Sequence, residues 1–266
     1  MALRNVRIEV AYDGASFYGW QRQDGFDSVQ AAIEDGLADL LGTIVTIHGA
    51  GRTDTGVHAL RQVAHFHVDT RLDDDRLRHA LNAHLPAAVR IRRAETCRDD
   101  FHARFDARGK RYAYVVQSTR HRPALGRSHV HWDPAPLDRA AMEEAIGRIV
   151  GRRDFAAFAT AGSPRKSTVR TVQHLKLVVR RERFAIVVQG DGFLYNMVRT
   201  IAGTLLQVGK GGMSPDDVSA ALEAADRRLS GPTAPASGLY LVRVLYDEPV
   251  FVGPDRGPSG VPGPLG

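Results

Sequence analysis

The stretch RQVAHFHVDTRLDDDRLRHALNAHLPAAVRIR, residues 61–92, decides the expected fold because it contains a strand, a helix and a strand in succession. Residues 61–69 are typical of a strand. Residues 73–85 favour a helix opened by three aspartates, since acidic side chains are favourable at a helix N-terminus. Residues 88–92 form a short apolar segment that indicates a second strand. Helices and strands are therefore expected to alternate along the chain.

The preceding residues extend this pattern to the N-terminus. Residues 6–12, VRIEVAY, alternate apolar and polar side chains, as a strand with one buried face does. Residues 28–41 place apolar side chains on one helical face, with Ser28 as the expected N-cap. A further strand is expected at 43–50. The order of the first half is then β-α-β-β-α-β.

The second half of the chain repeats that order. Strands are expected at 110–117, 172–179, 183–190 and 240–246, and helices at 137–150, at 193–208 and from Ser214–Pro215 onward. Two copies of a split β-α-β motif predict an α+β fold with ferredoxin-like halves, a continuous, mixed and mainly antiparallel sheet, and helices on one face. We expect the halves to span 1–105 and 106–248, and a Gly- and Pro-rich tail, 249–266, to be disordered and to carry no chemistry.

Composition limits the classes of protein that need to be considered. The 266 residues are 43% hydrophobic, enough for one large or two small cores, and no apolar run is long enough to cross a membrane. Cys97 is the single cysteine, so neither an intramolecular disulfide nor a zinc knuckle can form. The N-terminus lacks a signal-peptide pattern, and we expect a cytoplasmic protein. The formal net charge of +6, carried mostly by arginines, suits RNA but also fits a compositional bias.

The densest polar cluster is GAGRTDTGVHA, residues 49–59, in a loop at a strand end. Its glycines allow another chain to approach the backbone closely. Arg52 and Asp54 lie two residues apart in this loop, and polar residues on loops are frequent sites of function. From the spacing alone, a surface turn with an exposed ion pair is the somewhat better interpretation, since it describes most pairs of this kind.

Three other motifs are weaker. Asp54-Thr55-Gly56 matches the tripeptide of aspartic proteases, but those enzymes need two carboxylates sharing a proton and only one copy is present. The segment from Gly203 to Lys210 lacks the spacing of a phosphate-binding loop and reads as helix. His65 and His67 share a strand face without a third ligand at motif spacing, so we expect no metal site.

Three segments combine aromatic and basic side chains. YDGASFYGWQRQ, 12–23, suits base stacking on RNA, although core aromatics around a turn would have the same composition. FHARFDARGKRYAY, 101–114, is a candidate for phosphate contact because it has five basic residues. GDGFLYNMVRT, 190–200, is expected to open a helix with Asp191 and Gly192 and places Arg199 among apolar residues. A charge there is costly unless it is paired, and Asp54 is a candidate partner.

Taken together, these segments resemble the TruA-type tRNA pseudouridine synthase family, in its bacterial form. The resemblance continues through GRRDFAAF (151–158), STVRTV (167–172), GFLYNMVRTIAGTLLQVG (192–209) and APASGLYL (234–241), in the family's order. It covers the chain from about residue 5 to residue 246. It implies a central RNA-binding cleft and a homodimer that binds tRNA across both subunits. It also implies conversion of uridine to pseudouridine at positions 38, 39 and 40 of the anticodon stem-loop, with no cofactor, metal, DNA or membrane.

The resemblance also implies roles for individual residues. Asp54 matches the catalytic carboxylate, which either attacks C1′ or removes a sugar proton, and Arg199 matches its basic partner. Tyr112 matches the active-site tyrosine that stacks on uracil and helps to remove the C5 proton. Arg52 matches the arginine that fills the gap left by the flipped base or holds its phosphate, and Leu239 is expected to pack under the base. Further phosphate contacts are expected from Arg22, Arg104, Arg108 and Arg111.

One alternative of a different class is a non-catalytic protein that binds or folds tRNA, because split β-α-β halves also occur in RNA-binding folds. A pure binder gains nothing from a carboxylate that faces RNA phosphate. The pairing of Asp54 with Arg199 therefore separates the two hypotheses.

Overall fold

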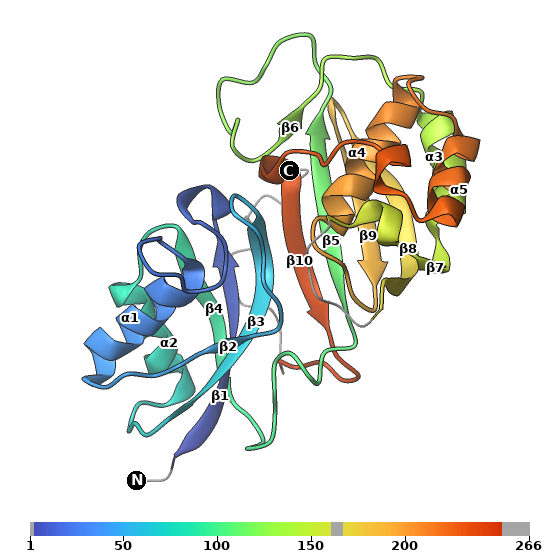
Figure 1. Cartoon of the computed structure of the whole chain (residues 1–266). Coiled ribbons are helices and arrows are strands. Elements are labelled where there is room, and N and C mark those ends of the chain that lie inside the picture. Colours follow the sequence, from blue (N-terminus) through green and yellow to red (C-terminus); the bar gives the residue numbers. More distant parts are fainter. Residues whose placement is uncertain (1–2, 161–166, 252–266) are drawn as a thin grey trace. The chain divides into compact units, whose positions relative to one another are not determined.

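The structure is a computed structural model that describes residues 3–160 and 167–251 (Figure 1). It forms two compact units. Among the described residues, unit 1 comprises the chain up to Arg108 together with residues 241–251, and unit 2 comprises the chain from Gly109 to Tyr240. The chain passes from unit 1 to unit 2 after Arg108 and returns to unit 1 at Leu241. No helix in the described ranges is long and apolar enough to cross a membrane.

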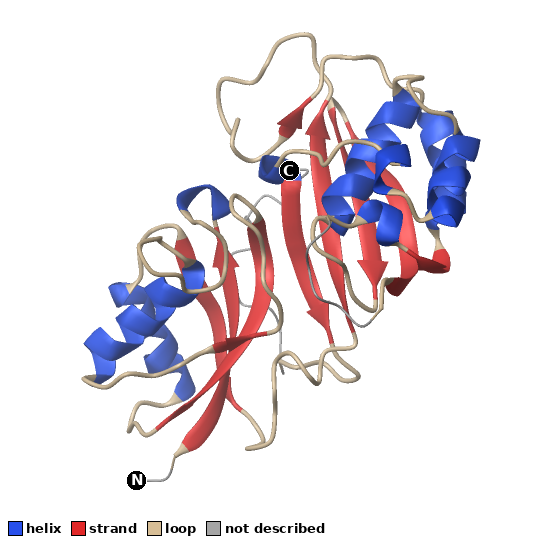
Figure 2. Ribbon diagram, viewed as in Figure 1, coloured by secondary structure: helices blue, strands red, loops and turns tan. Residues whose placement is uncertain are grey.

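Unit 1 is built around its first strand. The chain order is β1 (Arg4–Tyr12), α1 (Val29–Leu41), β2 (His48–Gly49), β3 (His58–Val68), α2 (Asp74–His84) and β4 (Val89–Thr96). β1 pairs antiparallel with β3 on one side and with β4 on the other, so that Ile8 lies opposite both Ala64 and Ala94. Both helices cover one face of this sheet (Figure 2).

The core of unit 1 lies between that face and the helices. Ile8 of β1 contributes a fully buried side chain, and so do Ile33 and Leu37 of α1 and Leu77 and Leu81 of α2. The helical spacing seen in the sequence therefore marks the buried stripe of each helix. The expected N-cap is confirmed, because the Ser28 hydroxyl accepts a hydrogen bond from the Ala31 amide at 3.2 Å.

The strand expected at 43–50 is mostly wrong, since only His48–Gly49 pairs with β3. The backbone of Ile47 bonds to side chains of α1 instead. Its amide donates to the Glu34 carboxylate at 3.1 Å, and its carbonyl accepts from the Gln30 amide at 3.3 Å. Ile44 is exposed rather than packed on the sheet. Helix side chains thus satisfy backbone groups that a strand would otherwise have satisfied.

Unit 2 repeats the arrangement with an extra helix. Its elements are β5 (Gly109–Gln117), β6 (His131–Trp132), α3 (Arg139–Ile149), β7 (Gly151–Asp154), β8 (Val169–Arg180), β9 (Arg183–Gly190), α4 (Met197–Gly209) and α5 (Pro215–Ala224). The strand order β5-β9-β8-β7 is antiparallel throughout, and β6 adds to β5 in parallel. β10 (Leu239–Leu245) begins in unit 2 and ends in unit 1. The α+β class and the repeated split β-α-β order are confirmed.

The start of α4 differs from the expectation that Asp191 and Gly192 open it. The helix begins at Met197, because Asn196 before it adopts a left-handed conformation with φ 61°. The Asp191 carboxylate accepts a hydrogen bond from the Thr171 amide at 3.0 Å, which ties it to β8. Four residues that seemed helical from their apolar spacing therefore form a turn that leads into α4.

The tail expected from residue 249 lies mostly outside the described residues. In its described part, the Phe251 ring lies 5.5 Å from the guanidinium of Arg7 and 5.2 Å from that of Arg93. These cation–π contacts fasten the start of the tail to unit 1, where the composition had predicted disorder.

Candidate active site

Asp54 lies in the loop between β2 and β3 and is half-buried. A tight turn fixes its backbone, because the Val57 amide donates to the Asp54 carbonyl at 3.1 Å. Gly56 within this turn has a φ of 78°, a conformation that glycine adopts without strain. The carboxylate thus projects from a defined turn rather than from a loose surface loop.

A second loop, residues 13–27, packs directly on this turn. The Trp20 amide donates to the Thr53 carbonyl at 3.0 Å, and the hydroxyls of Tyr12 and Thr53 lie 2.8 Å apart in a buried position. A Cβ on Gly49 would lie 2.6 Å from the Trp20 ring, so only glycine fits there. Most aromatic side chains of the 12–23 segment are therefore core side chains that support the Asp54 loop.

Tyr18 is the exception in that segment. Its side chain is 54% exposed, and its ring lies 4.9 Å from that of Phe26. Of the two interpretations of the segment, core packing thus holds for Trp20 and Phe17, and an exposed stacking surface remains for Tyr18.

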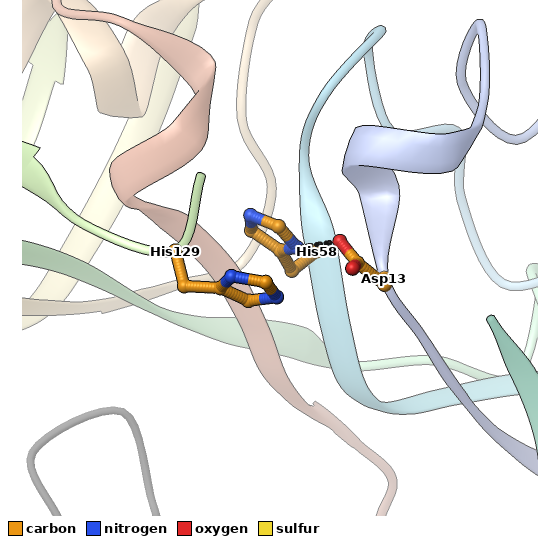
Figure 3. Close-up of side chains that lie close together, drawn as sticks. All are labelled: Asp13, His58 and His129. Atoms are coloured by element: carbon orange, nitrogen blue, oxygen red, sulfur yellow. Dashed lines mark ion pairs between the residues drawn. The ribbon is translucent and has the colours of Figure 1, made fainter. Parts of the chain in front are cut away.

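His58 follows the Asp54 loop and was not singled out in the sequence. Its side chain is buried, and its Nδ1 lies 3.0 Å from the Asp13 carboxylate and 3.1 Å from the Gly14 amide (Figure 3). Asp13 in turn caps the short turn after β1 by accepting from the Ala15 amide at 3.0 Å. His58 therefore joins the loop of Asp54 to the end of β1. Its place in the polar cluster 49–59 was the one available signal.

The candidate phosphate-binding arginines fall into two groups. Arg22 bonds to the carboxylates of Glu34 and Asp35, each at 2.6 Å. Arg108 bonds to Asp247 at 2.8 Å, and Arg111 donates to the side-chain oxygen of Gln189 at 2.6 and 3.0 Å. Arg52 and Arg104 are exposed and make no ion pair with any described residue. The guanidinium groups of Arg52 and Arg104 are therefore the ones best able to contact a phosphate.

The two histidines considered as metal ligands lie on β3. His65 is buried, and its Nδ1 accepts a hydrogen bond from the Ala103 amide at 3.2 Å. Burial, followed by the neighbouring imidazoles of His102 and His48, lowers the pKa of His65 to about 4. A neutral ring used as an acceptor supports the structural interpretation of this histidine.

In unit 2, the candidate residues project from regular elements. Tyr112 in β5 is 8% exposed, and its ring meets that of Phe193 edge-to-face at 5.3 Å. Leu239 at the start of β10 is also buried. Both side chains therefore belong to the packed part of the unit, where their positions are fixed.

Arg199 lies in α4 and is half-buried. Its Nε donates to the Ala234 carbonyl at 2.7 Å, and one Nη donates to the Asn196 side-chain oxygen at 2.9 Å. Burial raises the pKa of nearby Tyr114, and the positive charge of Arg199 opposes that rise. Both acceptors are neutral. They therefore orient the guanidinium but do not compensate its positive charge.

The chain is similar in sequence to a known family of proteins. The sequence profile of the tRNA pseudouridine synthase family matches residues 8–106 and 145–247. A "tRNA pseudouridine synthase A" from Caldicellulosiruptor bescii is 41% identical over 244 residues, covering 92% of this chain and 100% of the relative. Proteins with the same name from Agrobacterium fabrum and Geobacillus kaustophilus are 43% and 41% identical, covering 95% and 94% of this chain and 96% and 97% of the relatives. Asp54, Arg199 and Leu239 lie within the matched segments, and Tyr112 lies between them.

Proposed function

Because this chain belongs to the tRNA pseudouridine synthase family, it is an isomerase of tRNA uridines, and we propose that it acts at positions 38, 39 and 40 of the anticodon stem-loop. The relatives are named as synthases, which favours an enzyme over a protein that only binds tRNA. The observation that carries the assignment of the site is the half-buried Asp54 on a turn fixed by hydrogen bonds.

The reaction breaks the N1–C1′ bond of uridine and joins C1′ to C5 of the same uracil. The proton on C5 leaves and N1 gains a proton, so no atom is gained or lost overall. Positive charge develops at C1′ as the glycosidic bond breaks, and a carboxylate can stabilise or trap it. We assign this role to Asp54, acting on the sugar of a uridine flipped out of the RNA stack.

Asp54 has to be ionised to act. A guanidinium beside it would favour the charged form and orient it. Arg199 fits that role because its two described hydrogen bonds go to neutral acceptors. The proposal thus requires the Arg199 guanidinium to pair with the Asp54 carboxylate.

Tyr112 and Leu239 are proposed to contact the uracil. The edge-to-face contact with Phe193 fixes the plane of the Tyr112 ring, so that a rotating uracil could stack on its face. The hydroxyl of Tyr112 would help to remove the C5 proton. Leu239 supplies an apolar surface under the base.

The arginines are proposed to hold the RNA backbone. Arg52, exposed and two residues from Asp54, would fill the space of the extruded base or hold its phosphate. Arg104 would contact another phosphate. Arg22, Arg108 and Arg111 would have to give up their present partners, so their contribution should be smaller.

The resemblance further supports a homodimer that binds tRNA across both subunits, and a cytoplasmic location. Sedimentation velocity of the purified protein tests the first point. A dimer is expected, and a monomer that modifies tRNA at full rate would remove the second subunit from the proposal.

Pseudouridine mapping tests the function itself. Unmodified tRNA transcripts carrying uridine at 38, 39 or 40 are incubated with the protein, treated with carbodiimide and read by reverse transcription. Stops are expected at these positions and nowhere else in the transcript. Transcripts that show no new stop, or stops only outside the anticodon arm, would refute the assigned substrate.

A further inference from the structure

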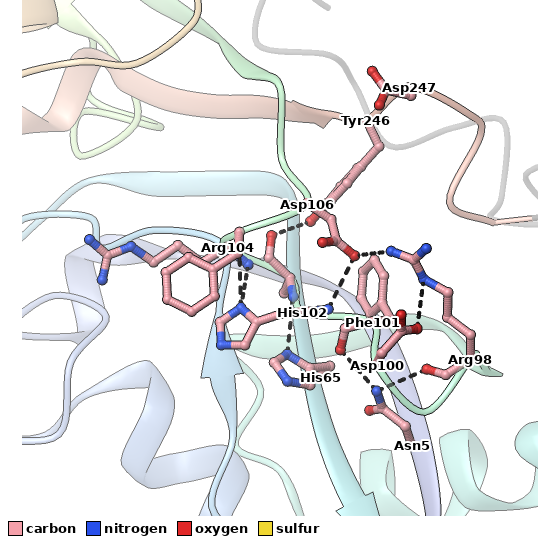
Figure 4. A network of polar contacts seen from close by, with 12 residues as sticks. Asn5, His65, Arg98, Asp100, Phe101, His102, Arg104, Asp106, Tyr246 and Asp247 are labelled. Carbon is pink, nitrogen blue, oxygen red and sulfur yellow. Dashed lines mark hydrogen bonds and ion pairs between the residues drawn. The ribbon is translucent and has the colours of Figure 1, made fainter.

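The loop 98–106 of unit 1 is held in place by a network of hydrogen bonds (Figure 4). The Asn5 amide donates to the carbonyls of Arg98, Asp99 and Phe101 at 3.2, 3.2 and 2.9 Å. The Ala103 carbonyl accepts from the Tyr246 hydroxyl at 2.6 Å, and its amide donates to His65. These hydrogen bonds therefore fix the backbone conformation of the loop.

This fixed loop nevertheless exposes a large aromatic ring. Phe105 is 71% exposed, whereas Phe101, four residues earlier, is 5% exposed and lies against Tyr246. The ring of Phe105 lies over His102, with centroids 4.1 Å apart and planes 30° from parallel. A phenylalanine kept in water on a fixed backbone contributes little to folding and leaves its exposed surface available to a ligand.

His102 keeps this stack neutral. Its Nδ1 accepts from the amides of Arg104 and Phe105 at 3.2 and 3.3 Å, so this nitrogen carries no proton. Burial and the neighbouring ring of His48 lower the pKa of His102. The two rings together present a neutral π-surface at neutral pH.

Arg104 adds a positive charge over the Phe105 ring. Its guanidinium lies 5.9 Å from the Phe105 centroid and is exposed. No described residue forms an ion pair with it. An aromatic face beside an uncompensated guanidinium is the combination that binds a single-stranded nucleotide, through stacking on the base and contact with its phosphate.

We propose that Phe105, stacked on His102 and flanked by Arg104, is a platform for an unpaired base of the tRNA. The inference rests on the proposed function for its RNA partner. The platform binds and positions the RNA, while the chemistry on uridine belongs to Asp54. Its loss should therefore weaken tRNA binding and leave the rate of the bound complex unchanged.

Four variants test the platform. Phe105→Ala and Phe105→Leu remove stacking, and Leu keeps an apolar side chain of similar volume. Phe105→Tyr keeps the ring. Ile44→Ala is the matched control, because Ile44 lies in the same unit and is 89% exposed. The dissociation constant for unmodified tRNA, the KM and the single-turnover rate at saturating tRNA are measured for each.

Phe105→Ala and Phe105→Leu should both raise the dissociation constant and the KM about tenfold, in the range of base–aromatic stacking. The dissociation constants and KM values of Phe105→Tyr and Ile44→Ala should stay within about twofold of those of wild type. The single-turnover rate of every variant should also stay within about twofold of the wild-type rate.

Three results would overturn the proposal: wild-type affinity in Phe105→Leu, a lowered single-turnover rate in Phe105→Ala, or dissociation of a dimer into monomers by Phe105→Ala. The last result would assign the surface to a second copy of the chain. Failure of wild-type protein to form pseudouridine would instead refute the proposed function, and the binding series would still report on the platform.

Discussion

The two units share one order of strands and helices but present their candidate residues in different ways. Unit 1 presents Asp54 from a loop, which is held by glycine contacts and polar side chains. Unit 2 presents Tyr112 from a strand and Arg199 from a helix, both packed on an apolar core. The position of the carboxylate therefore depends on local contacts of a loop, whereas the positions of the tyrosine and arginine depend on the packing of the core.

The largest expected effect of a single substitution on stability is in unit 2. Ile201 in α4 is fully buried, two residues from Arg199. Ile201→Ala should lower the free energy of unfolding by about 2–5 kcal/mol, because it leaves a cavity. Activity should fall together with the melting temperature. The exposed control Leu229→Ala should change stability by less than about 0.5 kcal/mol. A stable Ile201→Ala protein would contradict the view that the core of unit 2 positions its site residues.

Acid should weaken unit 1 through His65. Its pKa of about 4 in the folded state lies below the ordinary value of 6.5, so the unfolded chain binds the proton more readily. Stability from this group is therefore complete above about pH 6.5 and falls as the pH drops toward 4, by on the order of 2–3 kcal/mol. Urea unfolding at pH 7 and pH 5 measures the loss.

The matched control for that measurement is His65→Asn. An asparagine oxygen can accept from the Ala103 amide but does not titrate in this range. This variant should lose less stability than wild type between pH 7 and pH 5. An equal loss would show that other groups cause the acid sensitivity.

A smaller effect is expected at the support of the Asp54 loop. The hydroxyls of Tyr12 and Thr53 are buried against each other, so Thr53→Val should lower the free energy of unfolding by about 1–2 kcal/mol. The catalytic rate should fall even at temperatures where the variant is fully folded, because Thr53 directly precedes Asp54 and its movement displaces the carboxylate. Tyr12→Phe combined with Thr53→Val should cost less than the sum of the two single changes. Strict additivity in this double-mutant cycle would show that the two hydroxyls do not interact.

The smallest expected effect is the loss of a helix N-cap, which can be tested in both units. Ser28 caps α1 and Ser214 caps α5, where it forms a reciprocal pair with Asp217. Replacing either serine by alanine should lower the free energy of unfolding by about 1 kcal/mol. Only Ser28→Ala should also reduce activity, because Ser28 directly follows the loop 13–27 that supports Asp54. Steady-state kinetics at a temperature below the melting transition measure the activity of each variant. Equal activity of Ser28→Ala and Ser214→Ala would contradict the proposed difference between the two units.

Much of this architecture could be predicted from periodicity and caps. The buried stripes of α1 and α2 and the cap at Ser28 are local features that the sequence states directly. The strand at 43–50 and the start of α4 could not be predicted, because long-range contacts decide them: the side chains of Gln30 and Glu34 take the backbone of Ile47, and Asp191 bonds to β8.

The candidate site divides in the same way. The polar loop with Arg52 and Asp54 was visible as a dense motif, and the resemblance supplied Tyr112, Arg199 and Leu239. His58 was missed because its partners, Asp13 and Gly14, lie more than 40 residues earlier in the sequence. The pairing of Arg22 with Glu34 and Asp35 was likewise invisible, since it depends on how the loop folds back on α1.

The most direct test of the account is the rate of tritium release from tRNA labelled at uracil C5, compared between wild type and Asp54→Asn at saturating enzyme. Asparagine keeps the size of the side chain and removes its charge. Tritium release should fall about a thousandfold or more in Asp54→Asn, while tRNA binding stays within about threefold of wild type. Release at the wild-type rate with intact binding would contradict the role of the carboxylate.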